Sequence, residues 1–165
     1  MSARWHVVAG STGAGKSTFA RELAARVGGV RFSMDEWMTR LFWMDSPEKK
    51  DFAWAMERIA RCEEQIAAEA LQLAAVGVAA VLDLGFTLRE HREAWAMRAR
   101  AAGVGVELHV LDVPAEVRWG RVCERNGGTS ETFSFEVTRE MFDFMEARWE
   151  LPSADELAEF SRAEE

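Results

Sequence analysis

The sequence has few of the features that mark membrane, secreted or disulfide-linked proteins. Its 165 residues include only two cysteines, Cys62 and Cys123, and their spacing fits neither a disulfide framework nor a metal site. No apolar stretch approaches the roughly 20 residues of a membrane span, and no basic-then-apolar signal region opens the chain. We therefore expect a single domain, residues 1–165, that is cytoplasmic and has no membrane partner.

Basic residues are also in short supply. Lysine and arginine total 20 against 28 aspartates and glutamates, which gives a formal net charge of −8. A surface that holds polynucleotide phosphates needs clustered positive charge. Nucleic acid is therefore an unfavoured partner, unless the fold builds a local basic groove.

Against these absences stands one strong motif, a full match to the phosphate-binding loop G-x-x-x-x-G-K-[ST]. Its glycines let backbone N–H groups form an anion nest, and the following helix points its positive end at the same place. Lys16 would contact the β- and γ-phosphates, and Ser17 would ligate Mg²⁺. The motif predicts Mg²⁺ and ATP, with GTP as an alternative, as cofactors. The predicted cofactor-binding residues are Gly10, Ser11, Thr12, Gly13, Ala14, Gly15, Lys16, Ser17 and Thr18.

The hydrophobic pattern around this motif predicts an α/β fold. Short apolar runs, typical of buried strands, alternate with segments of helical periodicity. Right-handed crossovers between such strands place a ligand at their carboxyl ends. We expect a three-layer, nucleoside-kinase-like P-loop NTPase fold with a mainly parallel sheet of four or five strands. The predicted strands are 5–9, 30–33, 78–84 and 106–113.

Capping and breaking residues predict where the helices begin and end. Ser33 and Thr87 each open a capping box, and Ser46-Pro47 is typical of a helix start. The acidic tail after Pro152 is expected to be weakly ordered. The predicted helices run from the loop to 28, from 33 towards 42, from 46 to about 76, from 87 to 103, from 114 to 126 and from 135 to 149.

Two aspartates follow predicted strands and are candidates for the chemistry. Asp83 ends an apolar strand in the Walker B position, where a carboxylate holds Mg²⁺ directly or through water; the alternative is a cap of the next turn. Asp35 follows the second strand, so it should face the same crevice and accept the proton of an acceptor hydroxyl. The alternative for Asp35 is an acid that the helix dipole favours.

Three arginines precede a glycine-rich break at 126–130. Arg121 and Arg125 are four residues apart and share a helix face. We expect them to form a lid that neutralises charge on the transferring phosphoryl group. For Arg118 a lid role and a solvated helix face remain equally open.

An aromatic segment follows Asp35 and includes Trp37 and Trp43. Aromatic walls with few basic groups suit a small, partly apolar acceptor, and Arg40 would orient it. Ordinary core packing is the equally weighted alternative. Arg92 follows the strand of Asp83 and is a further candidate for the acceptor site.

The three histidines, His6, His91 and His109, share no common spacing. We therefore expect them to be structural, although His91 lies beside Arg92 and would reach the site if Arg92 does.

Together these residues resemble a group of P-loop kinases, AAA_33-like ATP-binding proteins that include phage polynucleotide 5′-hydroxyl kinase, zeta toxins and chloramphenicol phosphotransferase. The resemblance covers most of the chain. It implies ATP and Mg²⁺ use, phosphoryl transfer to a hydroxyl, Asp35 as general base, and Arg125 or Arg121 as lid residue. The segments that carry it are 10–18, the Asp35 segment, 82–83 with 89–95, and 111–114 leading to 124–126.

One departure from the polynucleotide kinase concerns the acceptor. That kinase has an arginine three residues after its aspartate, where this chain has Met38, and Arg40 is only nearby. Together with the acidic charge, this departure favours an ATP- and Mg²⁺-dependent phosphotransferase with a small-molecule acceptor. The alternatives are a polynucleotide or nucleotide-sugar kinase, or a slow ATPase that acts as a regulatory module.

Overall fold

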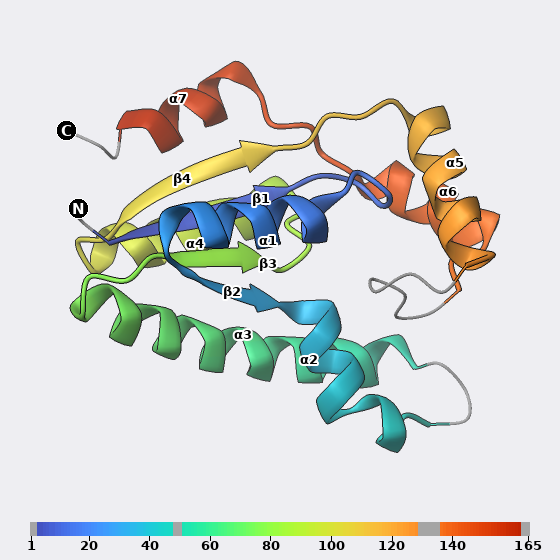
Figure 1. The fold of residues 1–165 in the computed structure, drawn as a ribbon, viewed down its shortest axis with the longest axis horizontal. Coiled ribbons are helices and arrows are strands. Elements are labelled where there is room, and N and C mark those ends of the chain that lie inside the picture. Colours follow the sequence, from blue (N-terminus) through green and yellow to red (C-terminus); the bar gives the residue numbers. More distant parts are fainter. Residues whose placement is uncertain (1–2, 48–50, 129–135, 163–165) are drawn as a thin grey trace.

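Four parallel strands form the centre of the structure, a computed structural model that describes residues 3–47, 51–128 and 136–162 (Figure 1). Their order in the sheet is β2-β3-β1-β4, and every neighbouring pair is parallel. The prediction of a P-loop α/β fold with a mainly parallel sheet is confirmed, with four strands. The strands are β1 (Arg4–Ala9), β2 (Val30–Ser33), β3 (Ala80–Asp83) and β4 (Gly105–Val110).

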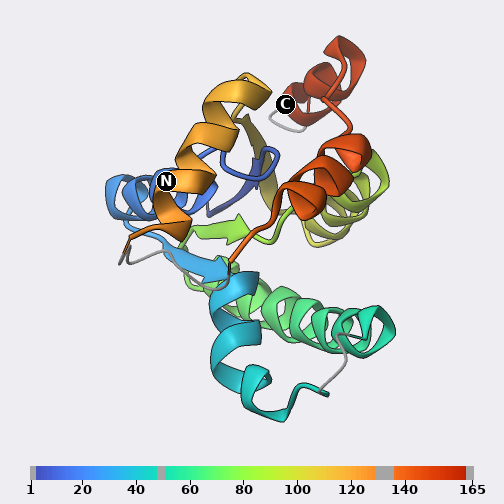
Figure 2. The same ribbon diagram turned by 90° about the vertical axis from the view of Figure 1, so that its right-hand side faces the viewer.

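Helices cover both faces of this sheet. The helix α1 packs on one face, while α3 and α4 pack on the other. Beyond the carboxyl ends of the strands, α2 lies on one side and α5 and α6 on the other (Figure 2). The described helices are α1 (Lys16–Val27), α2 (Met34–Leu41), a short 3₁₀ turn η1 (Trp43–Asp45), α3 (Phe52–Ala75), α4 (Arg89–Ala101), α5 (Ala115–Asn126), α6 (Arg139–Arg148) and α7 (Ala154–Arg162).

Strand β1 shows how the sequence produces these layers, because its side chains alternate between two cores. Trp5 is fully buried against Trp95 of α4, with ring centroids 5.6 Å apart, and its indole donates to the Ala70 carbonyl of α3. Val8 points to the opposite face and packs against Leu23 of α1. A central strand that is apolar on both faces is typical of a parallel sheet between helical layers.

The long helix α3 begins at Phe52, so the predicted start at Ser46 is wrong. Asp51 is the N-cap, and its carboxylate accepts a hydrogen bond from the Ala53 N–H at 2.9 Å. Ser46 instead closes the turn of η1, where its N–H donates to the Trp43 carbonyl. The sequence thus contains two possible caps, Ser46 and Asp51, only five residues apart, and α3 uses the second.

The capping box predicted at Thr87 does not form. Thr87 Oγ1 donates to the Gly85 carbonyl, and Leu88 occupies the N-cap position. The first helical N–H, that of Arg89, donates instead to the Glu150 carboxylate at 2.7 Å. The Glu150 carboxylate, distant in the sequence, thus accepts a hydrogen bond from the first turn of α4 in place of the predicted Thr87 hydroxyl.

The start of α6 is also later than predicted. Thr138 caps the helix by accepting from the Met141 N–H, and the first helical residue is Arg139. The first residue of the predicted helix, Phe135, and the end of the predicted glycine-rich break both lie outside the described residues.

The acidic tail contains an ordered helix, so the prediction of weak order after Pro152 is wrong. Helix α7 places Phe160 in the main core and Glu156 in full burial, 4% and 1% exposed. Glu156 pairs with Arg92, which is 0% exposed, through two hydrogen bonds of 2.5 and 3.0 Å. Within the part of the chain that the structure describes, no helix is both long and apolar enough to span a membrane.

Candidate active site

The phosphate-binding loop connects β1 to α1, as its motif requires. Gly13 and Gly15 have φ values of 80° and 92°, in the left-handed region that glycine adopts without strain. A Cβ atom at Gly13 would lie only 2.6 Å from the Arg118 carbonyl oxygen, so the close approach of α5 also requires glycine there. Helix α1 begins at Lys16 with no side-chain cap, which leaves its first N–H groups directed at the loop.

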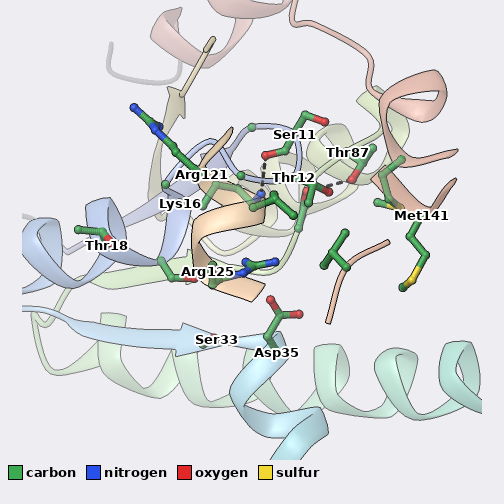
Figure 3. Close-up of a pocket in the computed structure, with 18 of the residues that line it drawn as sticks. Ser11, Thr12, Lys16, Thr18, Ser33, Asp35, Thr87, Arg121, Arg125 and Met141 are labelled. Atoms are coloured by element: carbon green, nitrogen blue, oxygen red, sulfur yellow. Dashed lines mark hydrogen bonds between the residues drawn. The ribbon is translucent and has the colours of Figure 1, made fainter. Parts of the chain in front are cut away.

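A pocket of about 450 Å³ opens at this loop (Figure 3). Its walls come from the phosphate loop, the start of α2, the turn after β3, and one face each of α5 and α6. Asp35 lines the pocket from α2, and Thr87 lines it from the turn after β3. The carboxyl ends of the strands therefore meet at the predicted crevice.

Lys16 and Ser17 line this pocket, and the Asp83 carboxylate lies against both of them. Lys16 Nζ donates to the Ser11 carbonyl at 3.1 Å. Burial lowers the pKa of the Lys16 ammonium, while the charges of Asp83 and Asp35 raise it. Burial raises the pKa of Asp83, and a hydrogen bond from Ser17 together with the Lys16 charge opposes that shift.

This cluster fits a hard divalent cation. Asp83 is 6% exposed, and its Oδ2 atom has no hydrogen-bond partner among the described residues. The Ser17 hydroxyl lies at the same carboxyl group. A hydroxyl and a carboxylate are oxygen ligands of the kind that Mg²⁺ prefers, usually with several waters.

Arg31, on β2, joins the two sides of the crevice and was not among the predicted site residues. Its guanidinium donates to the Ser17 carbonyl at 3.3 Å, lies 3.8 Å from Asp83 Oδ2, and pairs with Glu36 of α2. The sequence pattern of β2 did not indicate a site role for Arg31. It lies near Asp83 only because β2 pairs with β3 in the sheet.

The two arginines predicted for a lid lie on α5 and both line the pocket. In Figure 3, Arg125 extends toward Asp35, whereas Arg121 points away from it. Arg121 Nη1 donates to the Ala14 carbonyl at 3.4 Å. Arg125 Nε is buried and has no hydrogen-bond partner among the described residues. A phosphoryl group in the pocket is the partner that such a donor suits.

Arg118 holds the scaffold together, so neither role left open for it, a lid or a solvated helix face, is what the structure shows. It is 3% exposed and donates to the carbonyls of Val113 and Thr12 at 2.7 and 3.1 Å. Its third partner is the Glu146 carboxylate of α6, at 2.6 Å, which also accepts from the Ser11 hydroxyl. Arg118 therefore ties the phosphate loop to α5 and α6.

The predicted acceptor residues Trp37, Arg40, Trp43 and Arg92 do not line the pocket. Trp37 packs against Phe32 and the main core, which favours the core-packing alternative for it. Arg40 and Trp43 are exposed, one on α2 and the other on η1. The placement of Arg92 is corrected most strongly, because its guanidinium is fully buried against Glu156 and holds the turn after β3 through the Phe86 and Thr87 carbonyls.

A different set of residues forms the wall opposite the phosphate loop, and sequence reasoning missed it. Val137, Met141 and Met145 line the pocket at the N-terminal end and along one face of α6, and Thr87 adds a hydroxyl. The spacing of four residues between these three apolar side chains was a usable signal for one shared face. Nothing in the sequence pattern indicated that this face would turn toward Asp35.

Comparisons with known proteins agree with this geometry. A protein family described as an AAA domain, AAA_33, matches residues 6–152. The chain belongs to this family. A search of the curated proteins found no match.

Solved structures show the same fold. The chain is similar to a chain of the Pnkp1/Rnl/Hen1 RNA repair complex (16% identity, TM-score 0.68), to Kti12 of Chaetomium thermophilum in complex with ADP-AlF3 (18%, 0.67) and to a gluconokinase from Sinorhizobium meliloti 1021 (19%, 0.61). These matches cover 99%, 90% and 98% of this AAA_33 chain and 46%, 81% and 89% of the other chains. It thus spans less than half of the RNA-repair chain. The fold that they share is that of P-loop kinases.

Proposed function

We propose that this AAA_33 protein is an ATP-dependent phosphotransferase that moves the γ-phosphate of ATP to a hydroxyl group of a small molecule. The observation that carries the proposal is the position of Asp35. Its exposed carboxylate lines the same pocket as the phosphate loop and makes neither a hydrogen bond nor an ion pair with any described residue. A free carboxylate beside a phosphate site suits a catalytic base.

The phosphate side of the pocket would bind and polarise the nucleotide. The backbone N–H groups of the loop and the start of α1 favour the β- and γ-phosphates. Lys16 and Arg125 would add positive charge where negative charge is redistributed during transfer. A Mg²⁺ ion held by Ser17 and Asp83 would neutralise further phosphate charge when bound.

The acceptor side would activate the hydroxyl. Asp35 takes the hydroxyl proton as the acceptor oxygen bonds to the γ-phosphorus. The bond between that phosphorus and the β–γ bridging oxygen breaks, and its electron pair leaves with ADP. Both charged partners of this step, Asp35 and Arg125, already extend toward one another across the pocket.

The lining of the acceptor side favours a compact substrate over a polynucleotide. Thr87 offers a hydroxyl, and Val137, Met141 and Met145 offer apolar surface. The described cationic side chains that line the pocket, Lys16, Arg21, Arg121 and Arg125, come from the phosphate loop, α1 and α5. A polynucleotide acceptor would need further cations along its backbone path.

Transfer from γ-³²P-ATP to a metabolite library tests this proposal. The library should include sugars, sugar acids, aminoglycoside and phenicol antibiotics, nucleotide sugars and 5′-hydroxyl oligonucleotides, with an arm that lacks any acceptor. A labelled small-molecule product supports the proposal. A product formed only with oligonucleotides or nucleotide sugars, or acceptor-independent hydrolysis alone, would replace it with one of the alternatives.

Asp35→Asn supplies the sharper test once an acceptor is known. The variant keeps the size of the side chain but removes the base, so transfer should fall by about 10²–10⁴ while ATP affinity by calorimetry stays unchanged. Asp45→Asn, on the exposed η1 turn outside the pocket, is the matched control. Near-normal transfer by Asp35→Asn would leave Asp35 as a helix-dipole residue only.

A further inference from the structure

Two of the histidines meet on the sheet face that α1 covers. His6 lies on β1 and His109 on β4, and the parallel register pairs His6 with Glu107 and Val8 with His109. Strands β1 and β4 run side by side in the sheet (Figure 1). Side chains two residues apart on a strand share a face, so the register brings His6, Glu107 and His109 to one place.

The ligand atoms of these three side chains point at one another. His6 Nδ1 lies 3.0 Å from His109 Nε2 and 3.5 Å from Glu107 Oε2, and His109 Nε2 lies 3.6 Å from Glu107 Oε1. In the residues that the structure describes, this is a group whose ligand atoms lie within 4.8 Å of one another. It is separate from the phosphate pocket, which none of the three residues lines.

We propose that His6, Glu107 and His109 form a binding site for a first-row divalent transition metal ion such as Zn²⁺. Zn²⁺ binds nitrogen at 2.0–2.1 Å and carboxylate oxygen at 2.0–2.2 Å in tetrahedral geometry, which places neighbouring ligand atoms about 3.3–3.5 Å apart. The observed separations, 3.0 Å between the imidazole nitrogens and 3.5 and 3.6 Å from them to the two different oxygens of Glu107, lie within a few tenths of an ångström of that edge length. Two imidazoles and one carboxylate also match Zn²⁺ better than Mg²⁺, which prefers oxygen ligands.

The surroundings of the triad resemble those of a built site. Arg4 Nη1 donates to Glu107 Oε2 at 3.4 Å, which orients the carboxylate as outer partners do in metal sites. Phe19 of α1 packs at a tilt against the His109 ring, with centroids 5.4 Å apart, and limits its orientation. His6 is buried, whereas the Glu107 side chain is 42% exposed, so a fourth ligand position is open to water.

A bound ion would join β1 to β4 directly upstream of the phosphate loop. Gly10 lies four positions after His6, and a Cβ at Gly10 would meet the Leu111 carbonyl, just beyond His109, at 3.0 Å. We therefore assign the site a stabilising role for the pair of strands that carries the loop. Binding should raise Tm, since an ion that binds only the folded state stabilises it by mass action.

Metal titration of the purified, metal-stripped protein tests the site without any activity measurement. The probes are ZnCl₂, in competition with a chromophoric chelator, and CoCl₂, whose visible d–d bands report four-coordinate geometry. We expect one equivalent of either ion and a rise in Tm with Zn²⁺. Glu107→Gln and His109→Ala should each weaken Zn²⁺ binding at least about 10-fold. That is the lower end of the loss seen when a residue that only contacts a metal ligand is removed, and a ligand itself should matter more.

Two matched variants exclude other ligands of the chain. His91→Ala removes the third histidine, which pairs with Glu63 away from the triad, and Cys123→Ser removes the exposed thiol. Both should bind Zn²⁺ like wild type. Wild-type protein that binds no ion, or binding that survives Glu107→Gln and His109→Ala but fails in Cys123→Ser, would overturn the proposal. Glu107 is a half-exposed residue, so its variant keeps the test valid if His109→Ala folds poorly.

Discussion

Two buried clusters of charged side chains differ in how many of their polar groups have hydrogen-bond partners. Between α4 and α7, Arg92 donates to both oxygens of Glu156 and to two backbone carbonyls. At the phosphate loop, Lys16 bonds one carbonyl, while Asp83 Oδ2 and Arg125 Nε have no hydrogen-bond partner among the described residues. We call the Arg92–Glu156 cluster closed. We call the Lys16–Asp83–Arg125 cluster open, because its charged groups keep hydrogen-bonding capacity that no described residue uses.

This difference separates scaffold from site. An unsatisfied buried polar group costs free energy, and native proteins leave few of them. A cluster that keeps such groups at one end of a pocket is therefore a place that a ligand completes. The closed Arg92–Glu156 pair needs no ligand, and its effect is to dock α7 and hold the turn after β3.

Breaking the closed cluster should have the largest effect on stability. Glu156→Ala leaves the Arg92 guanidinium buried without its partner, which typically costs about 3–5 kcal/mol. Urea unfolding followed by circular dichroism measures the loss. Glu159→Ala, on the exposed side of the same helix, is the control and should change the free energy of unfolding far less. Equal stability of Glu156→Ala and wild type would show that α7 does not depend on this pair.

Breaking the open cluster should affect catalysis and spare the fold. Lys16→Ala removes a charge at the β- and γ-phosphates, and we expect a loss of at least about 10²–10³ in kcat/KM for phosphoryl transfer. Stability in urea should stay within about 1 kcal/mol of wild type, because burial already disfavours the Lys16 charge. If Lys16→Ala unfolds as readily as Glu156→Ala, the two clusters are not different in kind.

Asp83→Asn sharpens the contrast within the open cluster. A ligand at 100 times its Kd stabilises the folded state by about 2.7 kcal/mol. Asp83→Asn should lose most of the stabilisation that Mg²⁺ and ADP together give the wild type. The apoprotein should be about as stable as wild type, since burial raises the pKa of the Asp83 carboxyl while Ser17, Lys16 and Arg31 oppose that shift. Differential scanning fluorimetry with ADP, with and without MgCl₂, measures both. An unchanged Mg²⁺ response would remove Asp83 from the metal site.

Removal of a helix cap should have the smallest effect on stability. Asp51 satisfies the Ala53 N–H at the start of α3, so Asp51→Ala should cost about 1 kcal/mol. Ser46→Ala should cost much less, because Ser46 makes no side-chain hydrogen bond with the described residues. Chemical unfolding of both variants decides between the two helix starts, and the reverse ranking would restore the one predicted from sequence.

Much of the fold was predictable because its signals are local. The four apolar runs became the four strands, and β2 has the predicted ends, 30 and 33. β1 and α5 also end where predicted, at 9 and 126, whereas most other boundaries shifted by a few residues and the start of α3 moved from 46 to 52. Where two caps lie close together, as at Ser46 and Asp51, local chemistry permits both and the sequence alone does not decide between them.

The phosphate side of the site was determined by the sequence itself. Its phosphate loop is contiguous in residues 10–18, and the backbone alone positions it once β1 and α1 form, whereas Arg125 reaches the same side from α5. The positions of Asp35, which lines the pocket, and of Asp83 were also predictable, because Asp83 ends β3, Asp35 lies just after β2, and parallel strands end at one edge. Their chemical roles remain predictions.

Only the tertiary structure decided the contacts between distant segments. Arg92 meets Glu156 across 64 positions and His6 meets His109 across 103, and neither pair has a spacing that a sequence pattern reveals. Strand order, register and helix docking set such pairs, and these depend on how the whole core packs. For that reason Arg92, predicted for the acceptor, became a scaffold residue, and His6 and His109, which share no sequence spacing, lie within hydrogen-bond distance of each other.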